Sequence, residues 1–414
     1  MKRYEAYKPV TSRWAKQLPF YWEFQKIAEV FIERKENNDP IKTTNILSLT
    51  NTRGVIPYSD KGNLGNKAKN DIRGYRLAYP GDIVLNSMNV VIGSVGLSQY
   101  YGAVSPVYCM LYVRNNTKYN VRYYNYVFQD KIFQGGLNGL GNGILEIRMR
   151  IPMSKLKYVC VPVPPRDEQD QIVRYLDWQV SKINRLIAAK RKQIELLHEQ
   201  FSAVINSTIS GYDSSVPKYD SGISLFGQIP QGWHVRPFSK IATVKSNLVD
   251  PALYKDMQQI SPASIEKNTA RILELCTVEQ AGVSSPNHYF YKGQIIYSKI
   301  RPLLNKVIIA PFDGLCSADM YPIETVLDTE YLLFYLLSSS YLQQLSVTAN
   351  RVKMPKINQE ELGATLVLIP PEQEQREIVA IIKSKCSKIQ LLIEKIKLQI
   401  DAASDLRTRL ISDV

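Results

Sequence analysis

The chain contains an internal repeat, and a repeat constrains the architecture of a fold more than any single motif does. Residues 164–169, Pro-Pro-Arg-Asp-Glu-Gln, recur as residues 370–375, Pro-Pro-Glu-Gln-Glu-Gln, at an offset of 206. Upstream, residues 81–85 resemble residues 293–297 at an offset of 212. Insertions and deletions in loops would account for the drift of the offset. We therefore expect two copies of one domain in the same chain.

A long helix is predicted after each copy. Pro165 and Pro371 are followed by acidic residues, a pattern typical of a helix start. Apolar residues then step alternately by three and four, which is the heptad pattern of a coiled-coil seam. Lys190 and Arg407 interrupt it. The seam positions are Val173, Leu176, Val180, Ile183, Ile187, Ile194, Leu197 and Phe201 in the first helix, and Val379, Ile382, Cys386, Ile389, Ile393, Ile396 and Ile400 in the second.

Two such stripes in one chain most simply bury each other. The connectivity permits either direction, because a whole domain lies between the helices, but a two-fold relation between the copies favours antiparallel packing. Residues 173–204 would then form a rod of about 48 Å at ~1.5 Å per residue. One turn of B-DNA is shorter, at roughly 34–36 Å. We expect two domains held that far apart to meet one face of a duplex together.

The predicted domains are mixed α/β and mostly β. Short strand-like runs, such as residues 82–85 and 294–297, alternate with turn residues, and a helical stretch is expected late in each copy, at 120–128 and 330–337. The predicted boundaries are a first recognition-type domain at 1–165, a central helix at 166–212, a second domain at 213–371 and a C-terminal helix at 372–414.

The charge distribution points to a polyanionic partner. The net charge is +14, and residues 1–165 alone carry 23 Lys and Arg against 11 Asp and Glu. Residues 213–371 carry 14 of each. If the polyanion is nucleic acid, the first domain should neutralise most of the phosphates. With five scattered cysteines, three histidines and no apolar run of membrane-spanning length, we expect a soluble cytoplasmic protein without a metal site.

Catalytic motifs are missing from the sequence. An Asn/Asp-Pro-Pro-aromatic tetrad of amino-methyltransferases and a GxxxxGK[ST] phosphate loop are both absent. The glycine-rich run at 135–143 does not open a predicted helix, so we interpret it as a structural loop rather than a cofactor site, with a mobile DNA-facing loop as the alternative. Residues 33–35, Glu-Arg-Lys, offer half of a nuclease pattern, but a solvated helix end is the favoured reading. We expect no enzyme activity and no cofactor in this chain.

The duplicated domain, each copy followed by Pro-Pro-x-x-Glu-Gln-x-x-Ile and a heptad helix, resembles the DNA-specificity subunit of type I restriction–modification enzymes. The resemblance covers nearly the whole chain. It implies that each domain recognises one half of a split, asymmetric site in double-stranded DNA, and that the helices set the gap. It also implies that two methyltransferase subunits, which bind S-adenosylmethionine, dock on the helices. Restriction/translocase subunits would supply ATP hydrolysis and cleavage with Mg²⁺.

Candidate DNA contacts are the cationic and amide side chains near predicted loops. In the first domain they are Arg53, Lys61, Lys67, Lys69, Arg73, Arg76, Asn86, Ser87, Arg148 and Arg150. In the second domain they are Ser298, Lys299, Arg301, Asn305, Lys306, Arg351 and Lys353. Any one of them is otherwise an ordinary solvated residue. Two alternatives stay open: a subunit of this type serving a fused nuclease–methylase, and a coiled-coil scaffold that binds no DNA.

Overall fold

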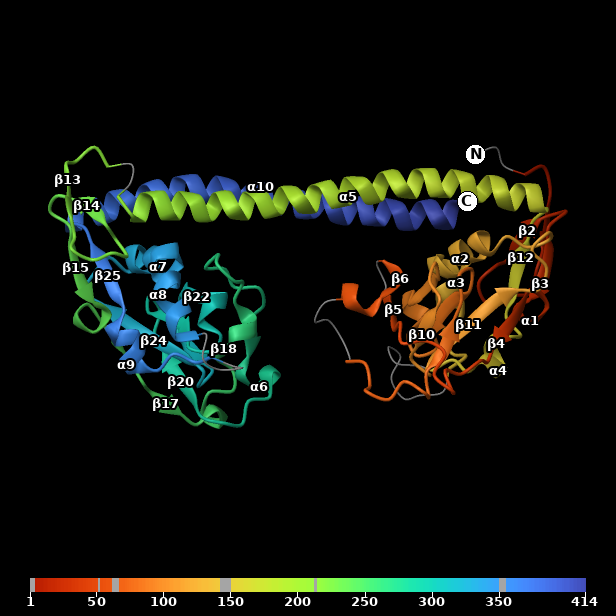
Figure 1. The fold of residues 1–414 in the computed structure, drawn as a ribbon, viewed down its shortest axis with the longest axis horizontal. Coiled ribbons are helices and arrows are strands. Elements are labelled where there is room, and N and C mark those ends of the chain that lie inside the picture. The colour runs from red at the N-terminus through yellow and green to blue at the C-terminus, as the bar shows by residue number, and fades with distance from the viewer. Residues whose placement is uncertain (1–3, 51–52, 62–66, 142–149, 212–213, 350–354) are drawn as a thin grey trace. The chain divides into compact units, whose positions relative to one another are not determined.

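A computed structural model describes residues 4–50, 53–61, 67–141, 150–211, 214–349 and 355–414 (Figure 1). The chain divides into two compact units. Unit 1 comprises residues 1–189 together with 399–414, and unit 2 comprises residues 190–398. Each unit therefore contains one globular domain and segments of two long helices, α5 (Arg166–Ile209) and α10 (Glu372–Asp413).

Unit 1 is built on a four-stranded antiparallel sheet in the order β4-β11-β8-β9. Its strands are β4 (Phe31–Arg34), β8 (Ile83–Asn86), β9 (Val95–Leu97) and β11 (Tyr108–Val113). Pairs of short strands surround it: β1 (Tyr7–Pro9) with β2 (Gln17–Pro19), β3 (Glu23–Lys26) with β12 (Cys160–Val163), β5 (Leu47–Thr50) with β6 (Gly54–Pro57), and β7 (Arg76–Ala78) with β10 (Gly102–Val104). The short helical segments are α1 (Ile27–Val30), η1 (Tyr58–Lys61), η2 (Val90–Ile92) and α4 (Met153–Leu156).

Two helices of unit 1, α2 (Val121–Gln129) and α3 (Lys131–Gly136), lie between this sheet and α5 (Figure 1). Each has a side-chain N-cap, Asn120 for α2 and Asp130 for α3. The buried aromatic rings of Tyr124, Phe128 and Phe133 form the centre of the core between these layers. This core continues into the first turns of α5.

Unit 2 repeats the central sheet in the order β16-β24-β21-β22. These strands are β16 (Ala242–Val244), β21 (Ile295–Ser298), β22 (Val307–Ile309) and β24 (Met320–Thr325). A second sheet, β17-β20-β23-β18-β19, contains β17 (Leu248–Val249), β18 (Gln258–Ile260), β19 (Cys276–Thr277), β20 (Asn287–Phe290) and β23 (Gly314–Cys316). Two strand pairs complete the β structure: β13 (Lys218–Asp220) with β14 (Gln228–Pro230), and β15 (His234–Pro237) with β25 (Leu366–Ile369).

The helices of unit 2 are α7 (Thr329–Leu337) and α8 (Ser339–Ala349), with the shorter α6 (Val278–Ala281) and α9 (Gln359–Ala364). Single 3₁₀ turns are η3 (Phe238–Lys240), η4 (Pro251–Leu253), η5 (Pro262–Ser264) and η6 (Pro302–Leu304). All nine residues of α7 except the first two are buried. They pack against α5 and α10 in one core.

The predicted repeat and fold class are confirmed. The strands β8, β9 and β11 correspond to β21, β22 and β24 at the constant offset of 212, and the helices α2 and α7 fall where helical stretches were expected. The glycines at 81 and 293 have φ of +91° and +88°, so both copies turn into this sheet through a backbone conformation that favours glycine.

The two long helices pair antiparallel within each unit. In unit 1, Val173 and Leu176 share a core with Leu410, and Asn184 accepts a hydrogen bond from Arg407 at 3.2 Å. In unit 2, the α5 residues 201–209 pack with the α10 residues 378–393. Every predicted seam position is buried or half-buried. The ends of the stripes are also part of the domain cores, which the heptad pattern alone did not predict.

One local prediction was wrong and a second was right only in part. Glu33 and Arg34 belong to strand β4 rather than to a helix end, and both form ion pairs. In the glycine-rich run, Gly135 and Gly136 end helix α3, whereas residues 137–141 form turns and bends, as expected of a loop. A Cβ at Gly136 would lie 2.4 Å from the Cβ of Trp14, so close packing explains this glycine. Residues 142–143 of the run lie outside the described residues.

Candidate nucleic-acid interface

The acidic residue of each repeated Pro-Pro motif fastens a helix start to its own domain. In unit 1, Glu168 accepts hydrogen bonds from the indole of Trp22 at 3.0 Å and from the hydroxyl of Tyr4 at 2.6 Å. In unit 2, Glu374 accepts a bond from the indole of Trp233 at 2.7 Å. The glutamates therefore have a structural role, and they orient each domain on its helix.

The glutamine of the motif is the more deeply buried member. Gln169 has no exposed surface, donates to the carbonyl of Pro164 at 2.8 Å, and accepts from the backbone N–H of Asn120 at 2.8 Å. Gln375 makes the same two contacts with the carbonyl of Pro370 and the N–H of Asp328. Each glutamine thus joins the start of a long helix to the N-cap of the domain helix, α2 or α7.

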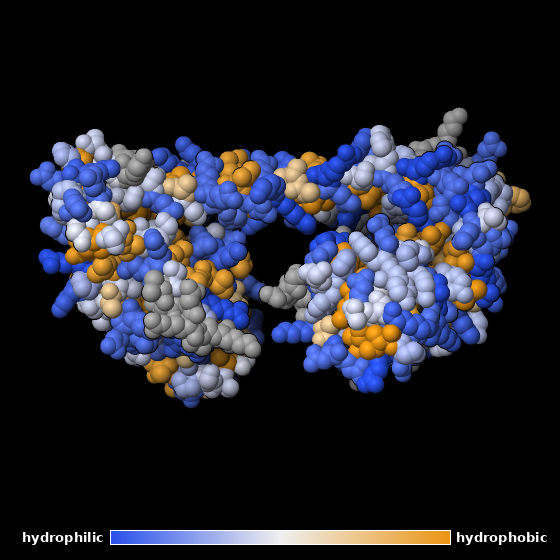
Figure 2. Space-filling view, in the orientation of Figure 1, coloured by the Kyte–Doolittle hydropathy of each residue, from blue (hydrophilic) through white to orange (hydrophobic). Residues whose placement is uncertain are grey.

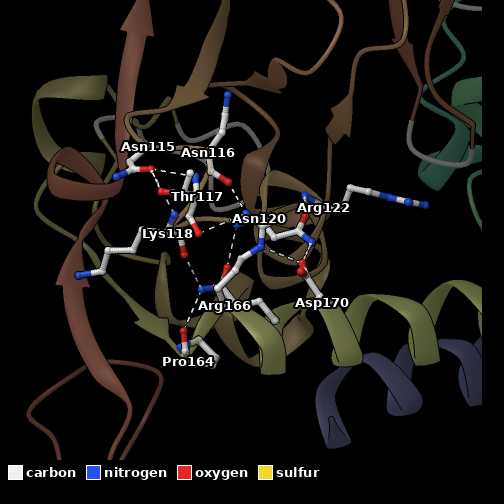
Figure 3. A network of polar contacts seen from close by, with 10 residues as sticks. Asn115, Asn116, Thr117, Lys118, Asn120, Arg122, Pro164, Arg166 and Asp170 are labelled. Carbon is white, nitrogen blue, oxygen red and sulfur yellow. Dashed lines mark hydrogen bonds and ion pairs between the residues drawn. The ribbon is translucent and has the colours of Figure 1, made fainter.

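Charged side chains reinforce this junction in unit 1. Arg166 donates to Asp170 at 2.9 Å, and the amide of Asn120 donates to the same carboxylate (Figure 3). These two donors lower the pKa of Asp170, Arg166 more than Asn120. The guanidinium of Arg166 also reaches the carbonyl of Asn116.

The second repeated motif supports the central sheet. Asp82 is buried and forms a two-pronged ion pair with Arg34, at 2.8 and 3.0 Å. The guanidinium also lies over the ring of Tyr79, 4.2 Å from the centroid. In unit 2 the corresponding residue is Gln294, which donates to Glu324 at 2.8 Å. The change from Asp to Gln is therefore matched by a change of partner.

A surface groove of about 690 Å³ in unit 1 contains three of the predicted contacts, Lys61, Lys67 and Asn86. Strand β5, the turn η1 and the ends of β8 and β10 bring them together. Among the described residues that line it there are two lysines and no carboxylate. The remaining polar and aromatic lining residues include Ser48, Thr50, Tyr58, Tyr75, Asn89, Ser94, Ser105 and Tyr108. This lining offers cations for phosphates, and amides and hydroxyls for bases or sugar.

The other candidates of the first domain lie outside that groove. Arg73 is held by the carboxylate of Asp71 at 2.8 Å, and the guanidinium lowers the pKa of Asp71 to about 2. Arg76 is in β7 and pairs with Glu33 at 3.3 Å. Three further candidates, Arg53, Lys69 and Arg150, are exposed.

Three predicted contacts are buried, which is a correction to the candidate set. The hydroxyl of Ser87 donates to the carbonyl of Val107, and that of Ser298 donates to the carbonyl of Ile300. Asn305 is buried with a left-handed backbone, φ +45°. These side chains have no surface from which to contact a base, because each points into the protein.

In unit 2 the exposed and half-buried candidates are Lys299, Arg301 and Lys306. Lys306 donates to the carbonyl of Pro262 at 2.6 Å, and burial lowers its pKa. Lys299 lies over the ring of Tyr321, 5.3 Å from the centroid. The last three candidates, Arg148, Arg351 and Lys353, lie outside the described residues.

Sequence reasoning missed several residues of the groove, notably Tyr58, Asn89 and Ser105. They are neutral and lie in three separate segments, so charge and local pattern carried no signal for them. No helix in the described part of the chain has the length and apolarity needed to cross a bilayer. Within the same residues, histidine, cysteine and acidic side chains do not gather into a group that could hold a metal ion.

The chain is thus a duplicated protein: two copies of one β-rich unit each lead into a long helix, and the two helices share a seam. A family model described as the type I restriction modification DNA specificity domain matches residues 19–196 and 230–402. The chain belongs to this family.

Individual relatives agree with that assignment. The chain is 31% identical over 303 residues to the type I restriction enzyme EcoDI specificity subunit of Escherichia coli, covering 69% of this chain and 67% of the relative. It is 22% identical to the putative type I restriction enzyme MjaX specificity subunit of Methanocaldococcus jannaschii, over 94% and 92% of the two chains. A solved chain, described under "complex assembly and conformational transition of the type I R-M system", shares the fold with a TM-score of 0.59 at 14% identity, covering 95% of this chain and 97% of that one.

Proposed function

We propose that each unit of this specificity subunit reads a different half of a split, asymmetric DNA site. The observation that carries the proposal is the duplicated scaffold with different chemistry at equivalent positions. Asn89, three residues after the end of β8, corresponds to Arg301, three residues after the end of β21. An amide pairs well with adenine, whereas a guanidinium pairs well with guanine. Identical units would favour a symmetric site.

We further propose that the subunit is non-catalytic and that the helix pair docks two methyltransferase subunits, on which S-adenosylmethionine binds. Apolar side chains outside the seam support a docking role. Leu391 is 58% exposed and Leu398 is 68% exposed, and hydrophobic surface is visible along the helices (Figure 2). Exposed apolar surface of this kind marks interaction sites. Restriction/translocase subunits would join the same complex in the cytoplasm and would bring ATP and Mg²⁺.

Mapping of methylated adenines tests the reading role. The chain would be produced with its methyltransferase in a host lacking other adenine methylation, and modified positions would be sequenced genome-wide. A split site with two unlike halves is the expected result. Random methylation, or a palindromic site, would contradict the proposal. Changing Asn89 to Ala should relax one half-site and leave the other unchanged.

The contribution of phosphate contacts is tested separately by salt dependence. The exposed Lys67 lies on the rim of the unit 1 groove, and its replacement by Gln should lower the slope of log K against log salt by about 1. Affinity for all sequences should fall together, without a change in the methylated site. A change of site would assign Lys67 to base reading instead.

A further inference from the structure

We propose that unit 1 contains a second anion site, for a phosphate group, in a cavity of about 350 Å³ separate from the groove described above. The cavity lies where the domain meets the two long helices. Its walls come from α2, α3, the η2–β9 segment, the first part of α5 and the last turns of α10. The proposal concerns binding of phosphate and adds to the reading function.

The charges that line this cavity are unbalanced. Four cations, Arg53, Arg122, Lys131 and Arg407, face one carboxylate, that of Asp177, among the described lining residues. Only Arg122 is paired with that carboxylate, at 2.7 Å. The carboxylate of Asp130, the residue before Lys131, is bonded to the backbone N–H groups of α3 and to the hydroxyl of Ser412.

Among the described residues, the other lining cations use few of their donors. Arg407 donates one hydrogen bond, to Asn184, and Lys131 donates one, to Gln134 at 2.9 Å. Arg53 donates from its guanidinium to the carbonyl of Asp60 at 3.0 Å. A guanidinium carries five N–H donors in a fork that matches phosphate oxygens. Donors therefore remain for an anion inside the cavity.

The duplicated unit provides an internal control for this reading. In unit 2 the cavity-lining residues Asn125 and Gln129 of α2 are replaced at the equivalent positions of α7 by Leu333 and Leu337, both buried. The position of Arg407 in the helix pair is taken by Phe201, which is 3% exposed. The same fold thus places buried apolar side chains at these three positions of unit 2.

An apolar filling is the more stable choice in such a region, because cavities and partly buried polar groups both cost free energy. The fold does not require the cations of unit 1, since unit 2 does without them. The ion pair at the rim is even reversed, Arg122 with Asp177 in unit 1 and Glu330 with Lys383 in unit 2. In unit 1 the described cations line a hollow.

Phosphate is the anion that this set of donors fits best, because arginine forks and a lysine together bind its tetrahedral oxygens. The phosphate could be free in solution or belong to a DNA backbone, and both have the same chemistry at the site. A free phosphate and a DNA phosphate can be distinguished by the salt dependence of DNA binding. Only a DNA phosphate would make these cations contribute to the salt dependence of DNA binding.

The test compares full-length variants by thermal unfolding in inorganic phosphate and in chloride at matched ionic strength. Phosphate above its dissociation constant should raise the unfolding midpoint of unit 1 by about 2–4 °C in the unchanged protein. Arg407→Leu should abolish this rise. The matched control is Arg409→Leu, an exposed residue of the same turn that does not line the cavity. Lys131→Gln, a change outside the helix pair, should reduce the rise as well.

DNA binding of the same variants identifies the source of the phosphate. A slope of log K against log salt that is smaller by about 1 in Arg407→Leu assigns a DNA phosphate, and an unchanged slope assigns a free one. Equal midpoints in phosphate and chloride for the unchanged protein would overturn the proposal. So would identical responses of Arg407→Leu and Arg409→Leu. Neither result would affect the methylation map that tests the reading function.

Discussion

The buried glutamine of the first Pro-Pro motif supports the sharpest stability prediction. Gln169→Leu keeps a similar side-chain volume but removes the bonds to the carbonyl of Pro164 and the N–H of Asn120, both at 2.8 Å. The buried carbonyl of Pro164 and the half-buried N–H of Asn120 would then lack a partner, which costs up to about 1–3 kcal/mol each. The third bond, to the carbonyl of the exposed Lys118, adds little because water can replace it. The expected loss is about 2–5 kcal/mol, below the sum of two full penalties because water can reach the half-buried N–H of Asn120.

Hydrogen exchange read by mass spectrometry is the suitable assay, since a chain with two units need not unfold in one step. Backbone amides of unit 1 should exchange at least about 30-fold faster in Gln169→Leu, because 1.4 kcal/mol corresponds to a factor of ten. Gln171→Leu, two residues further along α5 and exposed, is the matched control and should change stability by about 0.5 kcal/mol or less. Equal exchange in the two variants would refute the assigned role of the buried amide.

Three further predictions follow from single contacts. Asp82→Gln should destabilise unit 1 by about 2–3 kcal/mol, because Arg34 loses its buried carboxylate partner. This loss is expected even though unit 2 has a glutamine, Gln294, at the equivalent position. An unchanged melting temperature would contradict the prediction. Burial raises the pKa of Cys386 to about 11, so iodoacetamide at pH 8 should label this seam thiol only after denaturation. Labelling of the folded protein at the rate of an exposed thiol would show that the helices are not paired there. Arg166 lowers the pKa of Asp170 in the folded state. The stabilisation by the Asp170 carboxylate is therefore complete above the ordinary aspartate pKa of about 3.9, and it is lost as the pH falls through the lowered pKa of the folded state. Asp170→Asn should therefore flatten the fall in melting temperature below about pH 4, and an unchanged acid limb would argue against the ion pair.

In each unit an ion pair joins the domain helix to the start of a long helix, and the two pairs use different residues. This difference helps each domain to dock on its own helix. The Arg122–Asp177 pair and the Glu330–Lys383 pair occupy equivalent places with opposite polarity. If a domain docked on the other copy of the helix start, like charges would face each other. The exchange of one domain for a homologous domain should therefore include the helix residue that pairs with it.

Several features of this protein were determined by local sequence. The offset between repeats, the prolines and acidic first turns of the long helices, and the seven-residue spacing of apolar side chains together predicted the duplicated fold and the antiparallel helix pair. Such patterns are readable because helical periodicity and helix starts depend on residues within a few positions of each other. The resemblance to a family rested on the same short motifs, and the family match agrees with it.

Only the tertiary structure decided what individual side chains do. Lys61, Lys67 and Asn86 line one groove with the unpredicted Tyr58, whereas Asn305, equally plausible by residue type, is buried. The structure also showed that the Glu and Gln of the Pro-Pro motifs bind their domains. These outcomes depend on which strands and helices meet across more than a hundred residues, and that pairing is set by the packing of the whole core, so no local pattern encodes it.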